Sequence, residues 1–242
     1  MERAKNAGVN HMATCATMEE NFDRTLFLAG EYSGILPFFG VHPWFIESRS
    51  KNWTEVLTDF LLLTPSGVGE TGLDFVDPAA DREAQVKVFA FHLDLARQLK
   101  RPINIHVRKG WDTFIHILKK FGPLKIPGLI HSYSGSADMI QVFEKYNLYI
   151  SFSGSVTNPG ARKVVSALEQ VSHDRYVLET DAPDIYPYID NPHPDRLNEP
   201  ANIPQIAKIA AQRIGRAYRT FREHAYDNGC RLFEPIMKNK AG

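Results

Sequence analysis

The sequence lacks several features that would assign a protein to a class at once. It has only two cysteines, Cys15 and Cys230, in 242 residues, too few for a disulfide framework. No apolar run approaches the roughly 18 residues of a membrane-spanning helix, and no signal peptide is recognisable. Neither charge sign is in excess, because 28 basic residues balance 28 acidic ones. We therefore expect a cytoplasmic protein without membrane contact, in which any nucleic-acid binding comes from a local patch.

Several catalytic motifs are also missing. The sequence has no glycine-lysine loop of the Walker type, no GxGxxG and no serine in a nucleophile elbow, which argues against the enzyme classes that use them. It has no low-complexity linker and no charge block either. We expect residues 1–242 to form a single domain.

What the sequence does contain is a regular alternation of short apolar strands and amphipathic helices. In the clearest strand, residues 102–108, aliphatic side chains alternate with Asn104, His106 and Arg108, which therefore share one face. Further strands are expected at residues 9–14, 35–41, 128–131, 148–152 and 176–181 and around Glu70. Helices are expected at residues 1–7, 18–32, 53–63, 111–121, 137–146, 161–170 and 203–225, with another beginning at 77–78.

This alternation predicts a parallel sheet built from right-handed crossovers. The length of 242 residues is close to the roughly 250 of one α/β barrel. We expect an α/β fold of the TIM-barrel (β/α)8 type with about seven strands. An open doubly wound sheet is the alternative. It is less favoured because its polar strand ends would cluster at one crevice, whereas here they are spread over the whole chain.

Four acid and imidazole side chains are each expected at the C-terminal end of a different strand: Glu70, His106, His131 and Asp181. In a barrel these ends converge on the catalytic rim. Such a mixed nitrogen and oxygen set suits zinc, manganese or a similar divalent ion. Gly69 and Gly72 flank Glu70, and we expect them to let the backbone turn sharply and approach a ligand closely.

A divalent ion lowers the pKa of bound water toward neutrality and polarises a phosphoryl or carbonyl oxygen. Asp181 could accept the proton of that water or hold the water in line for attack. His42 also ends a strand and is expected to contact substrate, with turn chemistry as the alternative. Arg108 could bind phosphate bidentately, or pair with a barrel acid such as Glu179.

Binding of a nucleic acid would need basic and aromatic side chains near these strand ends. Lys109 follows the His106 strand and is well placed for a phosphate, as are Arg162 and Lys163. Tyr133 and Trp44 could stack on bases, and packing in the protein interior is the alternative for both.

Taken together, the motifs resemble those of the TatD-type metal-dependent deoxyribonucleases. They are GVHP at 40–43, GETGLD at 69–74, PINIHVR at 102–108, IHSYSG at 130–135, LETDAP at 178–183, NEP at 198–200 and NGCRLF at 228–233. The resemblance covers nearly the whole chain in the right order. It implies a TIM barrel of the amidohydrolase type that holds one or two divalent ions (zinc, manganese or magnesium) and hydrolyses phosphodiester bonds in DNA.

By that resemblance Glu70 bridges two ions, His106 and His131 hold one of them, and Asp181 binds the other and serves as the base. The family pattern opens with a His-x-His strand that completes one metal site, and no His-x-His occurs in this sequence. We therefore expect a barrel without its first strand. Its open edge, between the strands around Val9 and Tyr176, could pair with a second copy of the chain.

Three functions follow from this pattern. The first is a TatD-like deoxyribonuclease that uses a metal-activated water, since Glu70, His106 and His131 still form a three-ligand set. The second is a metal-dependent hydrolase of small esters or amides on the same scaffold. The third is a non-catalytic relative, impaired by the loss of the His-x-His strand.

Overall fold

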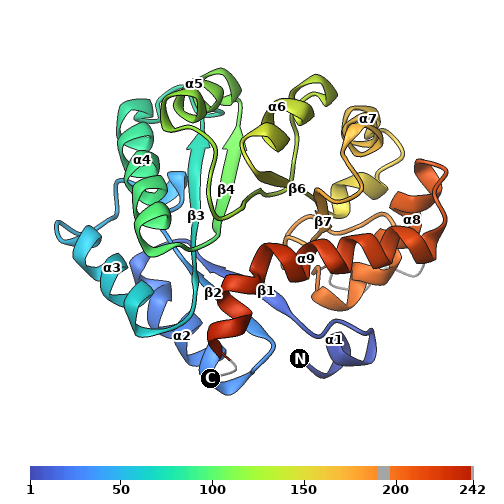
Figure 1. The fold of residues 1–242 in the computed structure, drawn as a ribbon, viewed down its shortest axis with the longest axis horizontal. Helices are drawn as coiled ribbons and strands as arrows, with labels where there is room; N and C mark the ends of the chain where they lie inside the picture. The colour runs from blue at the N-terminus through green and yellow to red at the C-terminus, as the bar shows by residue number, and fades with distance from the viewer. Residues whose placement is uncertain (190–196, 241–242) are drawn as a thin grey trace. The chain divides into compact units, whose positions relative to one another are not determined.

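The computed structural model describes residues 1–189 and 197–240 of the chain. Internal contacts divide the chain into two compact units, each built from strands and helices (Figure 1). The Glu70 unit comprises residues 11–130 and the chain from Leu232 onward. The Asp181 unit comprises residues 1–10 and 131–231. The single domain expected over residues 1–242 stays a prediction.

The Glu70 unit alternates strands with helices along residues 11–130. Its strands pair in parallel and in chain order, from β1 to β5. Helix α4 packs against β3, and α4 and α5 run beside β3 and β4 in Figure 1. The elements are β1 (Met12–Ala16), α2 (Phe22–Glu31), β2 (Ile35–Phe39), α3 (Trp53–Leu63), β3 (Gly67–Asp74), α4 (Arg82–Leu99), β4 (Ile103–Arg108), α5 (Trp111–Phe121) and β5 (Gly128–Ile130).

The Asp181 unit contains two strands, β6 and β7, among its described residues, and they also pair in parallel. Its elements are α1 (Glu2–Asn6), α6 (Ile140–Lys145), β6 (Leu148–Phe152), α7 (Arg162–Gln170), β7 (Tyr176–Leu178), α8 (Ile203–Arg213) and α9 (Tyr218–Lys240). Helix α9 continues into the Glu70 unit from Leu232. The predicted α/β fold with about seven strands is confirmed by the seven strands of the described residues.

Two of the predicted helices begin or end at the wrong place. A single helix over 203–225 is wrong, because α8 ends at Arg213 and α9 begins at Tyr218. Between them Gly215 has a φ of 65°, a conformation that glycine adopts readily and that ends helices. The helix expected to begin at residues 77–78 begins instead at Arg82, where the side chain of Asp81 caps it by accepting from the amide of Ala84.

Strand β2 is buried on both faces, as expected for a parallel strand covered by helices. On one face Phe39 packs edge-on against Phe22 of α2, with ring centroids 5.4 Å apart. On the other face Leu36 and Phe38 form a hydrophobic cluster with Ile236 of α9. The last turns of α9 therefore belong to the core of the Glu70 unit.

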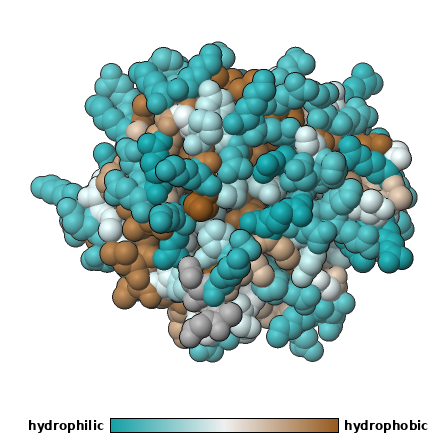
Figure 2. Space-filling model, in the orientation of Figure 1, coloured by the Kyte–Doolittle hydropathy of each residue, from teal (hydrophilic) through white to brown (hydrophobic). Residues whose placement is uncertain are grey.

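The face of the molecule in Figure 2 is mostly hydrophilic, with a hydrophobic area over the region of α3. The large exposed hydrophobic side chains of α3 are Leu62 and Leu63. Such exposed residues are ordinary on protein surfaces. Among the described residues, none of the helices combines the length and apolar character that crossing a membrane requires.

Candidate metal centre

Glu70 lies in the middle of β3, not at the end of a strand as the sequence predicted. The strand continues to Asp74. Its pairing with β4 shifts by one residue between Val68 and Thr71, which makes Glu70 part of a bulge. A bulge changes the direction in which a side chain points. The position of Glu70 therefore comes from this irregularity and not from the end of the strand.

The glycines on either side of Glu70 let β3 lie close to β4. Gly69 has a φ of 122°, and a Cβ built there would lie 2.4 Å from the carbonyl oxygen of Asn104. Gly72 has a φ of 146°, and its Cβ would lie 2.0 Å from the carbonyl oxygen of His106. Any side chain would collide with the backbone of β4. The sharp turn toward a ligand that the sequence predicted is replaced by this close contact between strands.

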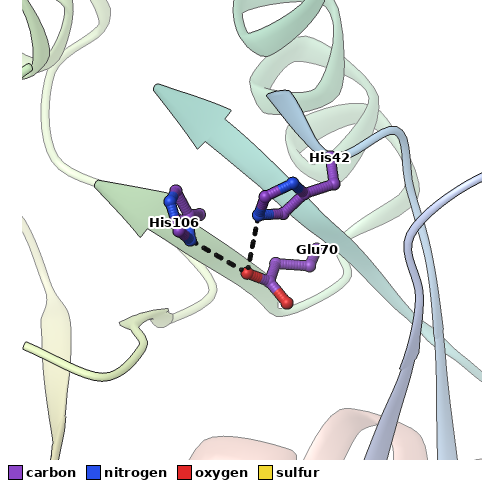
Figure 3. A group of neighbouring side chains, drawn as sticks. All are labelled: His42, Glu70 and His106. Carbon is purple, nitrogen blue, oxygen red and sulfur yellow. Dashed lines mark hydrogen bonds and ion pairs between the residues drawn. The ribbon is translucent and has the colours of Figure 1, made fainter. Parts of the chain in front are cut away.

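Glu70 contacts two imidazoles through a single oxygen (Figure 3). Its Oε1 lies 3.2 Å from Nδ1 of His106 and 3.3 Å from Nε2 of His42. The three side chains together offer ligand atoms that all lie within 4.8 Å of one another, close enough to bind one ion. His42 and His106 are buried, and 13% of the Glu70 side chain is exposed. The structure thus brings together two of the four predicted ligands, Glu70 and His106, and adds His42.

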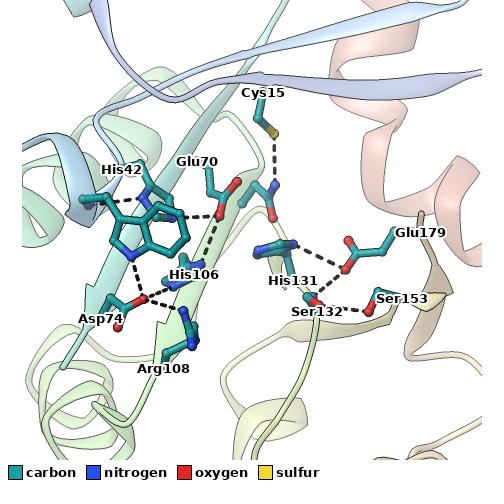
Figure 4. Close-up of polar contacts among 12 residues, drawn as sticks. Cys15, His42, Glu70, Asp74, His106, Arg108, His131, Ser132, Ser153 and Glu179 are labelled. Atoms are coloured by element: carbon teal, nitrogen blue, oxygen red, sulfur yellow. Dashed lines mark hydrogen bonds and ion pairs between the residues drawn. The ribbon is translucent and has the colours of Figure 1, made fainter. Parts of the chain in front are cut away.

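His106 has the hydrogen bonding of a metal ligand. Its Nε2 lies 3.0 Å from Oδ2 of Asp74, as Figure 4 shows. If that nitrogen donates its proton to the carboxylate, Nδ1 has no proton and directs its lone pair toward Glu70. Histidines that bind metals commonly donate their second nitrogen to a carboxylate in this way, which fixes the tautomer and the ring orientation. The donor set of Glu70 and His106 therefore fits a divalent ion.

Asp74 is held in its ionised form by its neighbours. Burial alone would raise the pKa of its carboxyl group, but hydrogen bonds from His106, the amide of Val76 and the indole of Trp44 outweigh that effect and hold the pKa well below its usual range. The Trp44 Nε1 lies 2.8 Å from Asp74 Oδ2. Arg108 Nη1 lies 3.4 Å from the same oxygen. Asp74 is therefore suited to accept the proton of His106.

Helix α4 fixes the backbone at this position. The Gln85 side chain accepts from the amide of Asp74 at 2.7 Å and donates to its carbonyl oxygen at 2.9 Å. Trp44 is 64% exposed although its indole nitrogen is bound to Asp74. The centre therefore has a carboxylate whose backbone is held by α4, and an indole that is hydrogen-bonded to that carboxylate while most of the residue is exposed to solvent.

His42 is arranged differently from His106. Its Nδ1 accepts from the amide of Trp44 at 3.2 Å, so the neutral ring carries its proton on Nε2. That protonated nitrogen faces Glu70. In this tautomer His42 is a hydrogen-bond donor to Glu70 or to a bound anion. Of the two roles the sequence left open, turn chemistry is present at Nδ1, and the substrate contact stays a prediction.

Buried His92 braces the residue before His42. Its Nε2 accepts from the amide of Val41 at 3.0 Å, and its Nδ1 lies 2.8 Å from the carbonyl oxygen of Val88. The ring also stacks on Trp53. Burial lowers the pKa of His92 from 6.5 to about 4, against the raising effect of its bond to Val88. The folded protein therefore holds this histidine neutral.

This histidine should make the free energy of unfolding depend on pH. Because the pKa of His92 is lower in the folded state, its contribution to stability is complete above pH 6.5 and is lost as the pH falls toward 4. The loss amounts to about 3 kcal/mol. Urea unfolding between pH 7.5 and pH 4.5 should show this slope, and the slope should be smaller in His92→Gln. The exposed His116→Gln is the control, and equal slopes in all three proteins would contradict the assignment.

In the Asp181 unit, His131 repeats the arrangement of His106 with a different acid. Its Nδ1 lies 3.3 Å from Oε1 of Glu179, an oxygen that also accepts from the amide of Ser132 at 2.6 Å (Figure 4). If Nδ1 donates to Glu179, Nε2 carries no proton and has the form of a metal ligand. His131 follows the end of β5 directly, as the sequence predicted.

Asp181 lies in the loop after β7. The strand expected at residues 176–181 ends three residues early, at Leu178, so Asp181 is not on the strand itself. Its φ of 58° is left-handed. The loop is held by the buried Asn198, whose side-chain amide donates to the carbonyl oxygens of Thr180 and Ile185 at 2.6 and 2.9 Å. His131 and Asp181 belong to one unit, and Glu70 and His106 to the other. Their meeting at one ion stays a prediction.

The two remaining predicted substrate contacts differ in exposure. Arg108 is half exposed and pairs with Asp74, an acid that the sequence interpretation did not assign to it. Tyr133 is only 1% exposed, and its hydroxyl donates to the carbonyl oxygen of Ser136 at 2.7 Å. Tyr133 is thus held as a packing residue, the alternative that the sequence left open. Trp44 is the more exposed of the two predicted stacking aromatics.

Sequence reasoning missed the residues that orient the histidines. Asp74 and Glu179 accept from the proposed ligands, and Asn198 holds the Asp181 loop. All three lie within motifs quoted above. The signal that could have found the two acids is that GETGLD and LETDAP each contain a second carboxylate beside the proposed ligand. Gln85 and His92 lie on α4, where nothing in the helical pattern distinguishes them.

Parallel strands followed by helices, with imidazoles and carboxylates on the strands and in the loops that follow them, are features of metal-dependent hydrolases with a TIM-barrel-like fold. Within that class the chain belongs to the TatD-related DNase family, whose model matches residues 1–234. The structure is similar to the crystal structure of YjjV, a TatD homologue from Escherichia coli. The TM-score is 0.89 and the sequence identity 28%, over 96% of this chain and 90% of that one. This likeness confirms the TIM-barrel-like fold.

Two curated relatives show how far the likeness extends in sequence. The chain is 28% identical over 236 residues to the uncharacterized metal-dependent hydrolase YabD of Bacillus subtilis, covering 96% of this chain and 91% of the relative. It is 33% identical over 220 residues to the 3'-5' ssDNA/RNA exonuclease TatD of Klebsiella pneumoniae, covering 87% and 82%. The chain is thus similar both to a relative named as a metal-dependent hydrolase and to one named as a nuclease.

Proposed function

We propose that this chain is a deoxyribonuclease that cleaves phosphodiester bonds. The observation that carries the proposal is the placement of His106, whose Nδ1 lies 3.2 Å from Oε1 of Glu70 and whose Nε2 lies 3.0 Å from Oδ2 of Asp74. The name of the Klebsiella pneumoniae relative, an exonuclease acting on ssDNA and RNA, supports nucleic acid as the substrate.

The residues proposed to hold one or two divalent ions (zinc, manganese or magnesium) are Glu70, His106, His131 and Asp181. When bound, such an ion lowers the pKa of water and polarises a phosphoryl oxygen. The carboxylates of Asp74 and Glu179 keep the two histidines in the tautomers that binding requires.

The other roles belong to side chains that can touch the substrate. Asp181 accepts the proton of the attacking water. His42 donates from Nε2 to a phosphate oxygen, because its Nδ1 is already bound by the amide of Trp44. Arg108 is half exposed, so it can keep its ion pair with Asp74 while it donates a second hydrogen bond to phosphate. The exposed faces of Trp44 can stack on a base.

The alternatives differ in what they need around the centre. A hydrolase of small esters or amides calls for a deep closed pocket without basic flanks. Here the basic residues Arg108 and Lys109 lie beside the centre, and this positive charge favours a phosphodiester substrate. A non-catalytic relative would bind no ion. Pairing with a second copy through an open strand edge is a separate expectation, which light scattering would test.

Metal content and phosphodiesterase activity test the proposal together. The purified protein is dialysed against zinc, manganese or magnesium, its metal content is measured, and it is then given single-stranded DNA and bis(p-nitrophenyl) phosphate. We expect bound metal and hydrolysis of both substrates, with chelation abolishing the activity. No bound metal in excess zinc or manganese would leave only the non-catalytic relative. Bound metal with turnover of carboxylic esters but not of DNA would favour the second function.

A further inference from the structure

An open cavity begins one residue beyond the metal centre. Phe75 follows Asp74 and Lys109 follows Arg108, and the two segments are joined by a 2.8 Å hydrogen bond from the amide of Phe75 to the carbonyl oxygen of Arg108. Phe75 and Lys109 line a cavity of about 590 Å³ together with Arg82 of α4. This volume falls within the range of small-molecule sites. The centre therefore has a neighbouring space that no residue of the proposed mechanism fills.

The lining of this cavity combines an aromatic face with available positive charge. The guanidinium carbon of Arg82 lies 4.9 Å from the centroid of the Phe75 ring. Lys87 is paired with Glu83 at 3.5 Å, so its charge is largely compensated. Within residues 1–189 and 197–240, by contrast, neither Arg82 nor Lys109 has an ion-pair partner. Arg82 and Lys109 thus line the cavity with Phe75 without an ion-pair partner among the described residues, although the acid Asp112 is also part of the lining.

We infer that this open cavity, called the groove below, binds the nucleotide next to the scissile phosphate of a single nucleic-acid strand. Arg82 and Lys109 contact the flanking phosphate, and the base lies on the surface formed by Phe75 and the Arg82 guanidinium. Proteins that bind single strands combine cations for the backbone with aromatic and guanidinium planes for the bases. The inference rests on the proposed nuclease function, because the groove adjoins the centre at Asp74 and Arg108.

The test compares two double variants that remove the same amount of charge. Each replaces one arginine of α4 and one lysine in or just before α5. In Arg82→Gln/Lys109→Gln both groove cations are lost. The matched control is Arg97→Gln/Lys120→Gln. Arg97, which like Arg82 lies on α4, stacks on Phe121, and Lys120 is exposed near the end of α5, yet neither lines the groove. Thermal melting checks that all the proteins fold.

Binding is measured by fluorescence anisotropy with the metal-loaded protein and a single-stranded phosphorothioate oligonucleotide, chosen because it resists cleavage. We expect the groove variant to bind about tenfold more weakly, and its plot of log K against log salt to be flatter by about 0.7 for each phosphate contact removed. The control variant should bind like the unmodified protein. Equal weakening in both double variants, no weakening in either, or no binding by the unmodified protein would overturn the inference.

Hydrolysis assays on two substrates distinguish a failure of this inference from a failure of the proposed function. The kcat/KM of the groove variant should fall more for an oligonucleotide than for bis(p-nitrophenyl) phosphate, which has no neighbouring nucleotide. An equal fall for both substrates would place the two cations at the reacting phosphate and would also overturn the inference. If the unmodified protein hydrolyses neither substrate but the groove variant still binds DNA more weakly, the nuclease proposal fails and the groove assignment stands.

Discussion

Replacing Asp181 with asparagine is expected to reduce kcat for DNA hydrolysis by roughly 10²- to 10⁴-fold, the usual contribution of a general base. Asparagine keeps the shape of the side chain and cannot accept the proton of water. It also tolerates the left-handed backbone of this residue, whose φ is 58°. The fold should therefore be unaffected. Initial rates on single-stranded DNA and a thermal melt of the same sample measure both effects.

Asp184→Asn is the matched control for this variant. Asp184 lies in the same loop and is exposed, so the same chemical change should leave both the rate and the melting temperature as they are. Undiminished turnover in Asp181→Asn would show that the base has been assigned to the wrong residue. A similar loss in both variants would instead point to a disturbed loop.

Replacing Glu70 with glutamine is expected to abolish metal binding at the centre. Oε1 of Glu70 faces both His106 and His42, and a glutamine would place at most a neutral oxygen or an amide nitrogen there. Asp74→Asn should have a smaller effect, because Asp74 orients His106 through Nε2. Loss of such a supporting carboxylate typically costs 10- to 100-fold in metal affinity. Calorimetric titration with zinc or manganese gives both affinities.

The order of these effects is the informative result. Glu55→Gln, an exposed acid of α3, serves as the control and should leave the affinity unaltered. If Asp74→Asn reduces the affinity as much as Glu70→Gln, Asp74 is itself a ligand. If Glu70→Gln binds metal normally, the proposed centre is wrong.

Local patterns in the sequence were sufficient for several elements. The alternation of aliphatic and polar side chains predicted β4, and the structure has that strand at Ile103–Arg108. Helical spacing predicted α3 and α5 with the bounds that the structure shows. These elements succeed because side-chain periodicity and end signals are properties of neighbouring residues in the chain.

The predictions that failed had two kinds of cause, a partner strand distant in the sequence and a choice between neighbouring local signals. Strand β3 extends to Asp74 because β4 supplies its hydrogen bonds, which glycine content alone does not reveal. The start of α4 at Arg82, rather than at residues 77–78, depended on which of two nearby capping signals the chain uses. Asp77 instead caps a short turn by accepting from the amide of Ala79.

By itself the sequence determined the family, the alternation of strands with helices, and the motifs that carry the acids and imidazoles. Only the tertiary structure decided which nitrogen of each histidine carries a proton. His106 is set by Asp74, and His42 by the amide of Trp44, although both rings face the same oxygen of Glu70. The physical reason is that a tautomer depends on the hydrogen-bond partner of the other nitrogen, and for His106 that partner comes from a different strand.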